Sequence, residues 1–313
     1  MIQFFKAGPQ GFTEIKECEP GCWINVEVPD DNDFSFLVHK LGIPETMLAY
    51  TSDIEERPRI EREDNWVLTI IRIPMRSHTS SVPFITVPIG IITGKCSDGA
   101  SFILTICYHH TELLADFIDH TQRKSICVIN EPQFILRMIF SAAYWYLTYL
   151  KRINSMVSHA EKELERSVRN RDLLQLMKMQ KSLVFFNTSL RGNEVLIARV
   201  RHVFSESEMD MDLLDDVEIE LKQALNTVSI YSDILNSTLD AFASIISNNV
   251  NMIMKRMTAV TIVLMVPTGI ASFYGMNVNI GLSGYKYAFW IIVGVSILIT
   301  GALCLLLRRY KWF

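Results

Sequence analysis

Hydrophobic and polar residues follow one pattern in the first 130 residues and another in the rest of the chain. The first part contains short β-branched and aromatic runs separated by turn residues, which are typical of strands. Between these runs lie stretches with helical spacing, one of them closed by a glycine. We expect strands at 22–28, 66–73 and 102–107 and in the two runs 84–87 and 89–92, and helices at 33–42 and 112–121. This mixture predicts one cytosolic α/β domain over residues 1–130.

Helical spacing dominates from Glu131 onwards. Residues 131–205 predict an antiparallel helical hairpin that turns near residues 170–172. From about Glu206, a very long stalk helix over 206–256 is expected, because apolar residues recur seven apart. One set of heptad positions holds Leu214, Leu221, Val228, Leu235 and Phe242, and the second holds Val217, Ala224, Tyr231 and Ile245, with Thr238 as an exception. Sustained heptads favour packing against helices of the same chain or of other copies.

Two uncharged apolar stretches follow, at 257–276 and 287–307, joined by a loop at 277–286. Each has about the 20 residues needed to cross a bilayer. Basic residues flank this hairpin on both sides: Lys255 and Arg256 precede it, and the tail at 308–313 contains Arg308, Arg309 and Lys311. The positive-inside rule therefore predicts two spans in the cell (inner) membrane, with both termini cytoplasmic. The first residues, Met1–Lys6, show no signal-peptide pattern.

Composition fits a soluble part combined with a few spans. Hydrophobic residues make up 49 % of the chain and charged residues 20 %, with a mean hydropathy of +0.20. The net charge is −4, but the segment from Lys255 onwards has six basic residues and no acidic one, so residues 1–254 carry −10. This acidity either serves solubility or collects cations near a pore mouth. It argues against nucleic-acid binding.

Cysteine and histidine spacing gives little support for a structural metal site. Cys18 and Cys22 are four apart and His109 is next to His110, but no paired zinc spacing occurs. Free or buried thiols are the favoured interpretation. Phosphate loops, nucleophile elbows and zincin motifs are also missing from the sequence, so we expect no enzyme and no organic substrate.

One face of the long helix is polar along its whole length. Steps of three and four residues from Asp233 select only polar residues and methionines. They are Asp233, Ser237, Asp240, Ser244, Ser247, Asn251, Met254, Thr258, Thr261, Met265, Thr268 and Ser272. A mean step of 3.5 keeps these residues on one face. We call this set the polar face.

The polar face has two interpretations. Serine and threonine often join packed membrane helices. Alternatively, several copies bring the face to a shared axis, where Met254 and Met265 form apolar constrictions and Asp233 and Asp240 ring the inner mouth. Two spans cannot enclose a pore alone, so the second interpretation requires a homo-oligomer in membrane lipid. Pro267 also lacks a backbone donor within the span.

Several motifs resemble the CorA magnesium transporter family. The most specific is Tyr274-Gly275-Met276-Asn277 before a short loop and a second span. Further matches are 254–258, 266–268, the stalk segment 240–251 and the basic-aromatic ending 308–313, where the basic residues would form a ring. Weaker matches are Ser189-Leu-Arg-Gly-Asn193 and Glu56-Arg-Pro58.

The resemblance implies a funnel-shaped homopentamer that takes up Mg²⁺, with Co²⁺ or Ni²⁺ as further possible ions. It implies an outer ion site at Asn277, supported by Tyr274, Gly275 and Met276. It places a regulatory Mg²⁺ site between subunits at Asp240. Its pore positions are Asn251, Met254, Met257, Met265 and Thr268.

The outer loop departs from the family pattern. Residues 278–286 contain no acidic residue and one lysine, where family members often have acids. A Zn²⁺ or other metal transporter of the same family is therefore an alternative. A second alternative, from another class, is a two-span membrane signalling receptor without ion flux.

Overall fold

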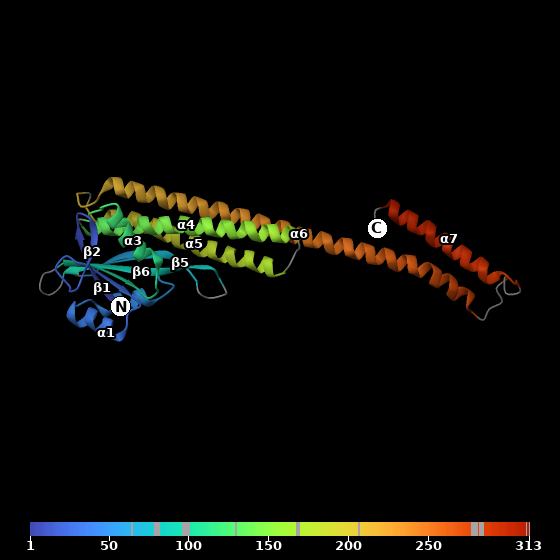
Figure 1. Cartoon of the computed structure of the whole chain (residues 1–313), viewed down its shortest axis with the longest axis horizontal. Helices are drawn as coiled ribbons and strands as arrows, with labels where there is room; N and C mark the ends of the chain where they lie inside the picture. Colours follow the sequence, from blue (N-terminus) through green and yellow to red (C-terminus); the bar gives the residue numbers. More distant parts are fainter. Residues whose placement is uncertain are drawn as a thin grey trace. The chain divides into compact units, whose positions relative to one another are not determined.

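The computed structural model describes residues 1–63, 65–77, 82–95, 101–128, 130–166, 170–205, 207–276, 281, 285–310 and 312. The chain divides into two compact units, Met1–Ser237 and Thr238–Phe313, here called the N-terminal and C-terminal units (Figure 1). Helix α6, Met211–Tyr274, contributes to both. The domain boundaries expected from the sequence stay predictions, whereas the expected fold class is confirmed: an α/β part is followed by a long helix and two apolar helical segments.

A seven-stranded mixed sheet forms the centre of the N-terminal unit, in the order β2-β1-β3-β7-β6-β5-β4. The β3–β7 pair is parallel, and the other neighbours are antiparallel. The strands are β1 (Ile2–Gly8), β2 (Gly11–Ile15), β3 (Trp23–Glu27), β4 (Arg59–Glu63), β5 (Trp66–Arg76), β6 (Phe84–Lys95) and β7 (Ser101–Cys107).

Both faces of this sheet are covered, which explains why its central strands are almost continuously apolar. Successive residues of a strand point to opposite faces. Ile24 of β3 belongs to a core cluster that also includes Leu37 and Leu48. Its neighbour Trp23 packs instead against Phe117 and Phe134. The covering elements are α1 (Asp31–Ser35), the π-helix η1 (Phe36–Lys40) and α2 (Glu45–Ser52) on the first face, and α3 (Glu112–Arg123), α4 (Glu131–Arg166) and α5 (Asn170–Val203) on the second.

The structure adds elements that the hydrophobic pattern did not predict: β1, β2, β4 and α2. Strand β4 reads Arg-Ile-Glu-Arg-Glu and lies at the edge of the sheet, so it has little apolar signal. The helix expected at 33–42 is α1 followed by η1, and Gly42 ends it with a φ of +71°. The runs at 84–87 and 89–92 form one strand, because Pro88 does not interrupt β6.

Arg72 of β5 ties together the two short segments that gave the weaker family matches. Its guanidinium donates to the carbonyl oxygens of Ile54 and Glu56, both at 2.8 Å, and to Ser189 Oγ of α5 at 3.1 Å. Burial lowers the pKa of this guanidinium. Asn193 completes the junction: Oδ1 accepts from the Arg72 amide at 3.0 Å, and Nδ2 donates to the Arg72 carbonyl at 2.8 Å.

Within the N-terminal unit, α6 buries the expected heptad positions. Leu214, Val217, Ala224 and Val228 are fully buried. Residues of α4 and α6 line one cavity together, and Gln180 of α5 donates to Asn236 of α6 at 2.5 Å. Up to Asn236, the heptads therefore pack against the α4–α5 hairpin of the same chain, whereas Ile245, farther along α6, is 47 % exposed.

The C-terminal unit consists of the rest of α6 and helix α7, Ala288–Arg309. Both helices contain an 18-residue window apolar enough to cross a membrane, with mean hydropathies of 1.6 and 2.6. Only 6 % of each window is buried within the chain. These segments therefore need an apolar environment or further protein around them.

Candidate ion pathway on helix α6

The polar face lies on one uninterrupted helix, as the sequence predicts. Its members from Asp240 to Ser272 belong to the C-terminal unit, and α6 is helical at each of them. All of these side chains are exposed in the single chain. Met254 and Met265 are 60 % and 67 % exposed, which is high for large apolar side chains. The described part of the chain thus leaves this face uncovered.

Two threonines of the polar face direct their hydroxyl protons into the helix. Thr261 Oγ1 donates to the Met257 carbonyl at 2.9 Å, and Thr268 Oγ1 donates to the Leu264 carbonyl at 2.8 Å. Such a hydroxyl has given its only hydrogen to the backbone, so its oxygen lone pairs remain available as acceptors. An acceptor oxygen is what a hydrated cation needs along its path.

Thr300 of α7 makes the same bond, to the Ser296 carbonyl at 2.7 Å. It belongs to the second apolar helix and not to the polar face. It therefore provides a natural control for the two threonines of α6.

Pro267 lies inside α6 next to Thr268. Because proline has no N–H, it cannot donate to the carbonyl of Val263 one turn earlier. The neighbouring carbonyl of Leu264 accepts from the Thr268 hydroxyl. The Val263 carbonyl, which lacks the proline N–H, and the Thr268 hydroxyl oxygen are therefore two acceptor oxygens close together in the apolar part of the helix.

The C-terminal end of the face is formed by the last residues of α6. Gly275 N–H donates to the Ala271 carbonyl at 2.9 Å, which closes the final turn after Tyr274. A Cβ on Gly275 would lie 3.3 Å from that carbonyl oxygen, so glycine permits the close turn. Tyr274 and Met276 are exposed by 41 % and 56 %. Asn277, the expected outer ion ligand, lies outside the described residues.

The charged residues expected near the inner mouth are exposed. Asp233 and Asp240 are both solvent-accessible on α6, and none of the ion pairs found among the described residues involves either of them. Clusters of three or more metal-binding side chains are likewise missing from the described part of this single chain. A metal site at Asp240 would therefore need ligands from another copy.

Met257 and the expected basic residues of the tail do not belong to the polar face. Met257, a pore position by resemblance, is 68 % exposed but is adjacent in sequence to Thr258 and so lies beside the polar face. Arg308 and Arg309 end α7 as exposed residues, whereas Lys311 falls outside the described residues.

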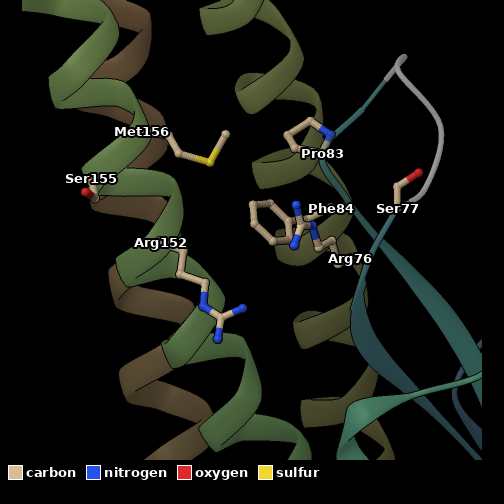
Figure 2. Close-up of a pocket in the computed structure, with 7 residues that line it drawn as sticks. All are labelled: Arg76, Ser77, Pro83, Phe84, Arg152, Ser155 and Met156. Atoms are coloured by element: carbon tan, nitrogen blue, oxygen red, sulfur yellow. The ribbon is translucent and has the colours of Figure 1, made fainter.

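A cavity of about 460 Å³ in the N-terminal unit was not anticipated from the sequence. Figure 2 shows Met156 extending from α4 toward Pro83 and Phe84, at the start of β6. The described residues that line the cavity are Arg76, Ser77, Pro83, Phe84, Arg152, Ser155 and Met156. This lining contains two guanidinium groups and no carboxylate, so it suits an anionic group better than a cation.

Comparison with protein families gives one match over most of the chain. The family model described as "CorA-like Mg2+ transporter protein" matches residues 19–309. Two curated relatives are cobalt/magnesium transport proteins CorA. The protein of Methanocaldococcus jannaschii is 24 % identical over 298 residues, which cover 93 % of this chain and 90 % of the relative. That of Thermotoga maritima is 22 % identical over 302 residues, covering 93 % and 83 %.

Two solved structures show the same fold over nearly the full length, and a third shows it over 80 % of the chain. The complete structure of the CorA magnesium transporter from M. jannaschii superposes with a TM-score of 0.83 at 20 % identity, covering 100 % of this chain and 99 % of the other. The full-length CmaX protein gives a TM-score of 0.69 at 14 % identity, covering 99 % and 97 %. The ZntB cytoplasmic domain from Vibrio parahaemolyticus gives 0.59 at 12 % identity, covering 80 % and 97 %.

Proposed function

The chain belongs to the family of CorA-like Mg²⁺ transporter proteins, which transport divalent cations, and from this premise we propose that it takes up Mg²⁺ through a pore lined by the polar face of α6. The observation that carries this proposal is the continuity of that face through an apolar helix. Its members between Asp240 and Ser272 recur at every third or fourth residue without a gap. A helix surrounded only by lipid has no use for such a face.

The pore requires several copies of the chain. Two membrane helices per chain cannot surround an aqueous path, and the polar face is uncovered in the single chain. Association that turns the faces toward a common axis removes hydroxyl and amide groups from lipid and gives them water and ions as partners. We propose a homopentamer, in keeping with the family resemblance.

The lining suits a cation that keeps its water. Mg²⁺ dehydrates reluctantly and prefers oxygen ligands in octahedral geometry. Thr261 and Thr268 offer acceptor oxygens, because each hydroxyl hydrogen is donated to the backbone. Met254 and Met265 bring apolar surface to two levels of the same face, where narrowing would exclude water and close the path.

Regulation would act at the inner part of the face. Asp240 is exposed and carries no ion pair within the described chain, so a Mg²⁺ ion between copies could gather several of these carboxylates. Bound Mg²⁺ would stabilise the closed assembly, and its loss would leave like charges that push the helices apart. Asp233, two turns earlier on the same face, would add to this acidic mouth.

The outer loop bears on the choice of ion. With no acidic residue at 278–286, cations outside receive no electrostatic concentration from this loop. Selectivity would therefore depend on the amide of Asn277, three residues after the last residue of α6 in the sequence. Co²⁺, Ni²⁺ and Zn²⁺ are the competing ions, and family membership favours each of them over a receptor without flux.

The test is ion uptake into liposomes that contain the purified full-length protein. Mg²⁺, Co²⁺, Ni²⁺ and Zn²⁺ are compared with ion-sensitive dyes at equal gradients. We expect Mg²⁺ to enter fastest. Zn²⁺ entering with Mg²⁺ excluded would make the protein a zinc transporter, and no flux of any ion would overturn the proposal.

Asn277→Ala provides the matched site variant, because Asn279 offers a second asparagine in the same loop. We expect Asn277→Ala to abolish Mg²⁺ uptake and Asn279→Ala to retain it. Equal losses in both variants would contradict a specific ion site at Asn277.

A further inference from the structure

Two cysteines meet at a tight turn between β2 and β3. The segment Cys18-Glu19-Pro20-Gly21-Cys22 has proline followed by glycine at its centre. Cys22 N–H donates to the Glu19 carbonyl at 3.1 Å, and Gly21 has a φ of +76°. These are the residues and the positive φ of a type II turn. The sequence between the cysteines thus specifies a sharp reversal of the chain.

This turn is fixed to the sheet. Gly21 N–H donates to the Ser101 carbonyl at 2.7 Å, and the Cys22 carbonyl accepts from Ile103 N–H at 3.2 Å. Both partners belong to β7, in the centre of the sheet. The position of Cys22 is therefore set by the core and not by a free loop.

The two sulfur atoms lie 3.7 Å apart, in van der Waals contact. The two thiols differ in access: Cys18 is exposed, whereas Cys22 is 1 % exposed. Sulfurs already in contact need only a small side-chain rotation to reach bonding distance. The other free cysteines in the described residues, Cys107, Cys127 and Cys304, have no comparable sulfur neighbour.

A metal site explains this pair less well. Groups of three or more cysteine, histidine and carboxylate ligands do not occur in the described part of the chain, and this includes the surroundings of Cys18. Two thiols alone leave a tetrahedral ion with half its ligands missing. Two thiols in contact are sufficient for a disulfide.

We propose that Cys18 and Cys22 form a redox-sensitive dithiol site, which peroxides oxidise to a reversible intramolecular disulfide. In a reducing compartment, such bonds are transient and serve redox sensing. The site belongs to the N-terminal unit and its chemistry is independent of ion transport. Its confirmation or failure therefore leaves the proposed function as it stands.

The reaction proceeds in two balanced steps. The Cys18 thiolate attacks one peroxide oxygen, the O–O bond breaks, and the leaving hydroxide takes a proton to become water; Cys18 is now a sulfenic acid. The Cys22 sulfur then attacks the Cys18 sulfur, and the S–O bond breaks. The hydroxyl group leaves as water with the proton of the Cys22 thiol. Two thiols are oxidised, and one peroxide is reduced to two waters.

The order of the steps follows from the surroundings of each sulfur. Cys18 is accessible to the peroxide and Cys22 is not. Burial raises the pKa of the Cys22 thiol to about 12, so it remains protonated until the second step. Contact between the sulfurs compensates for its low reactivity, because the attack is intramolecular.

Tryptic peptide mapping tests this directly, because cleavage after Lys16 and Lys40 places both cysteines in one peptide without any other cysteine. Full-length protein is treated with hydrogen peroxide, alkylated with iodoacetamide and digested without reductant. We expect peptide Glu17–Lys40 to become two hydrogens lighter and resistant to alkylation. Dithiothreitol should restore both reactive thiols.

Cys127 is exposed and has no sulfur neighbour among the described residues, so it provides the matched control. Cys127→Ser should leave the disulfide unchanged, whereas Cys22→Ser should convert the Cys18 peptide to oxygen adducts. Circular dichroism checks that each variant is folded. Three results would overturn the proposal: oxygen adducts without hydrogen loss in the wild-type peptide, a disulfide to another cysteine, or no change at peroxide levels that oxidise Cys127.

Discussion

Asn193→Ala should destabilise the N-terminal unit, because the Asn193 side chain forms hydrogen bonds with the backbone of Arg72 that a neighbouring strand would otherwise form. Pairing of β4 with β5 ends at Arg59 and Ile70, so no β4 residue reaches the backbone of Arg72. The fully buried Asn193 side chain accepts from the Arg72 amide at 3.0 Å and donates to its carbonyl at 2.8 Å. One side-chain amide thus replaces a strand partner.

The magnitude follows from what remains after truncation. The Arg72 carbonyl keeps the Tyr146 hydroxyl, which donates to it at 3.1 Å. The Arg72 amide has no substitute, and an unpaired buried donor costs about 1–3 kcal/mol. With the lost packing of the side chain, we expect a loss of roughly 2–4 kcal/mol in the free energy of unfolding. For a unit of this size, that lowers the melting temperature by about 5–10 °C.

Thermal unfolding of the full-length protein in detergent, followed by tryptophan fluorescence, measures this shift. Hydrogen exchange then locates it, because the β5 amides should lose protection. Asn187 is on the same helix and only accepts from Arg191 Nε at 3.1 Å, so Asn187→Ala should change stability by less than about 0.5 kcal/mol. Equal melting temperatures for Asn193→Ala and Asn187→Ala would refute the role of Asn193.

Three further predictions concern other parts of the chain. Gly192→Ala places a Cβ 2.7 Å from Pro58 Cγ, so the melting temperature should fall by several degrees, although alanine favours helices by about 1 kcal/mol; a rise would contradict the close contact. Burial lowers the pKa of His109 below its ordinary 6.5, so the folded state binds this proton less readily and stability should decline as pH falls below 6.5; urea titrations of His109→Gln should show a weaker decline. Asp240→Asn should raise the internal Mg²⁺ concentration that half-closes the channel by several-fold, whereas Asp215→Asn on the same helix should not, and equal values in a flux assay would remove Asp240 from regulation.

The sequence predicts the parts of the fold in which hydrophobic spacing is strong and local. The buried strands β5, β6 and β7 and the helices α3 to α7 all follow from such spacing. It misses β4, whose alternating charges lie at an exposed edge. It predicts a helix at 33–42 but not that Phe36–Lys40 form the π-helix η1, because five residues of a π-helix resemble any short helix. These elements depend on neighbours that are distant in sequence.

The polar face could be found from sequence because it belongs to one helix and depends on spacing alone. The Arg72 junction could not, since Asn193 is 121 residues away and only the folded sheet brings them together. Its visible signals were a lone arginine within the apolar run of β5 and the two weak family matches that contain Glu56 and Asn193. Contact between Cys18 and Cys22 was similarly hidden, because their spacing does not reveal the type II turn. In the proposed pore, the surroundings of the polar face would come from other copies, which no single-chain pattern specifies.

Mg²⁺ uptake by Thr268→Val and Thr300→Val proteoliposomes tests the proposed pore most directly. Both substitutions remove a hydroxyl bonded to a carbonyl one turn earlier, but only Thr268 belongs to the polar face. A lost hydroxyl contact of about 0.5–1.5 kcal/mol should slow uptake by roughly 2- to 10-fold in Thr268→Val, while Thr300→Val should keep the wild-type rate. Equal rates in the two variants, or a greater loss in Thr300→Val, would contradict a pore along this face of α6.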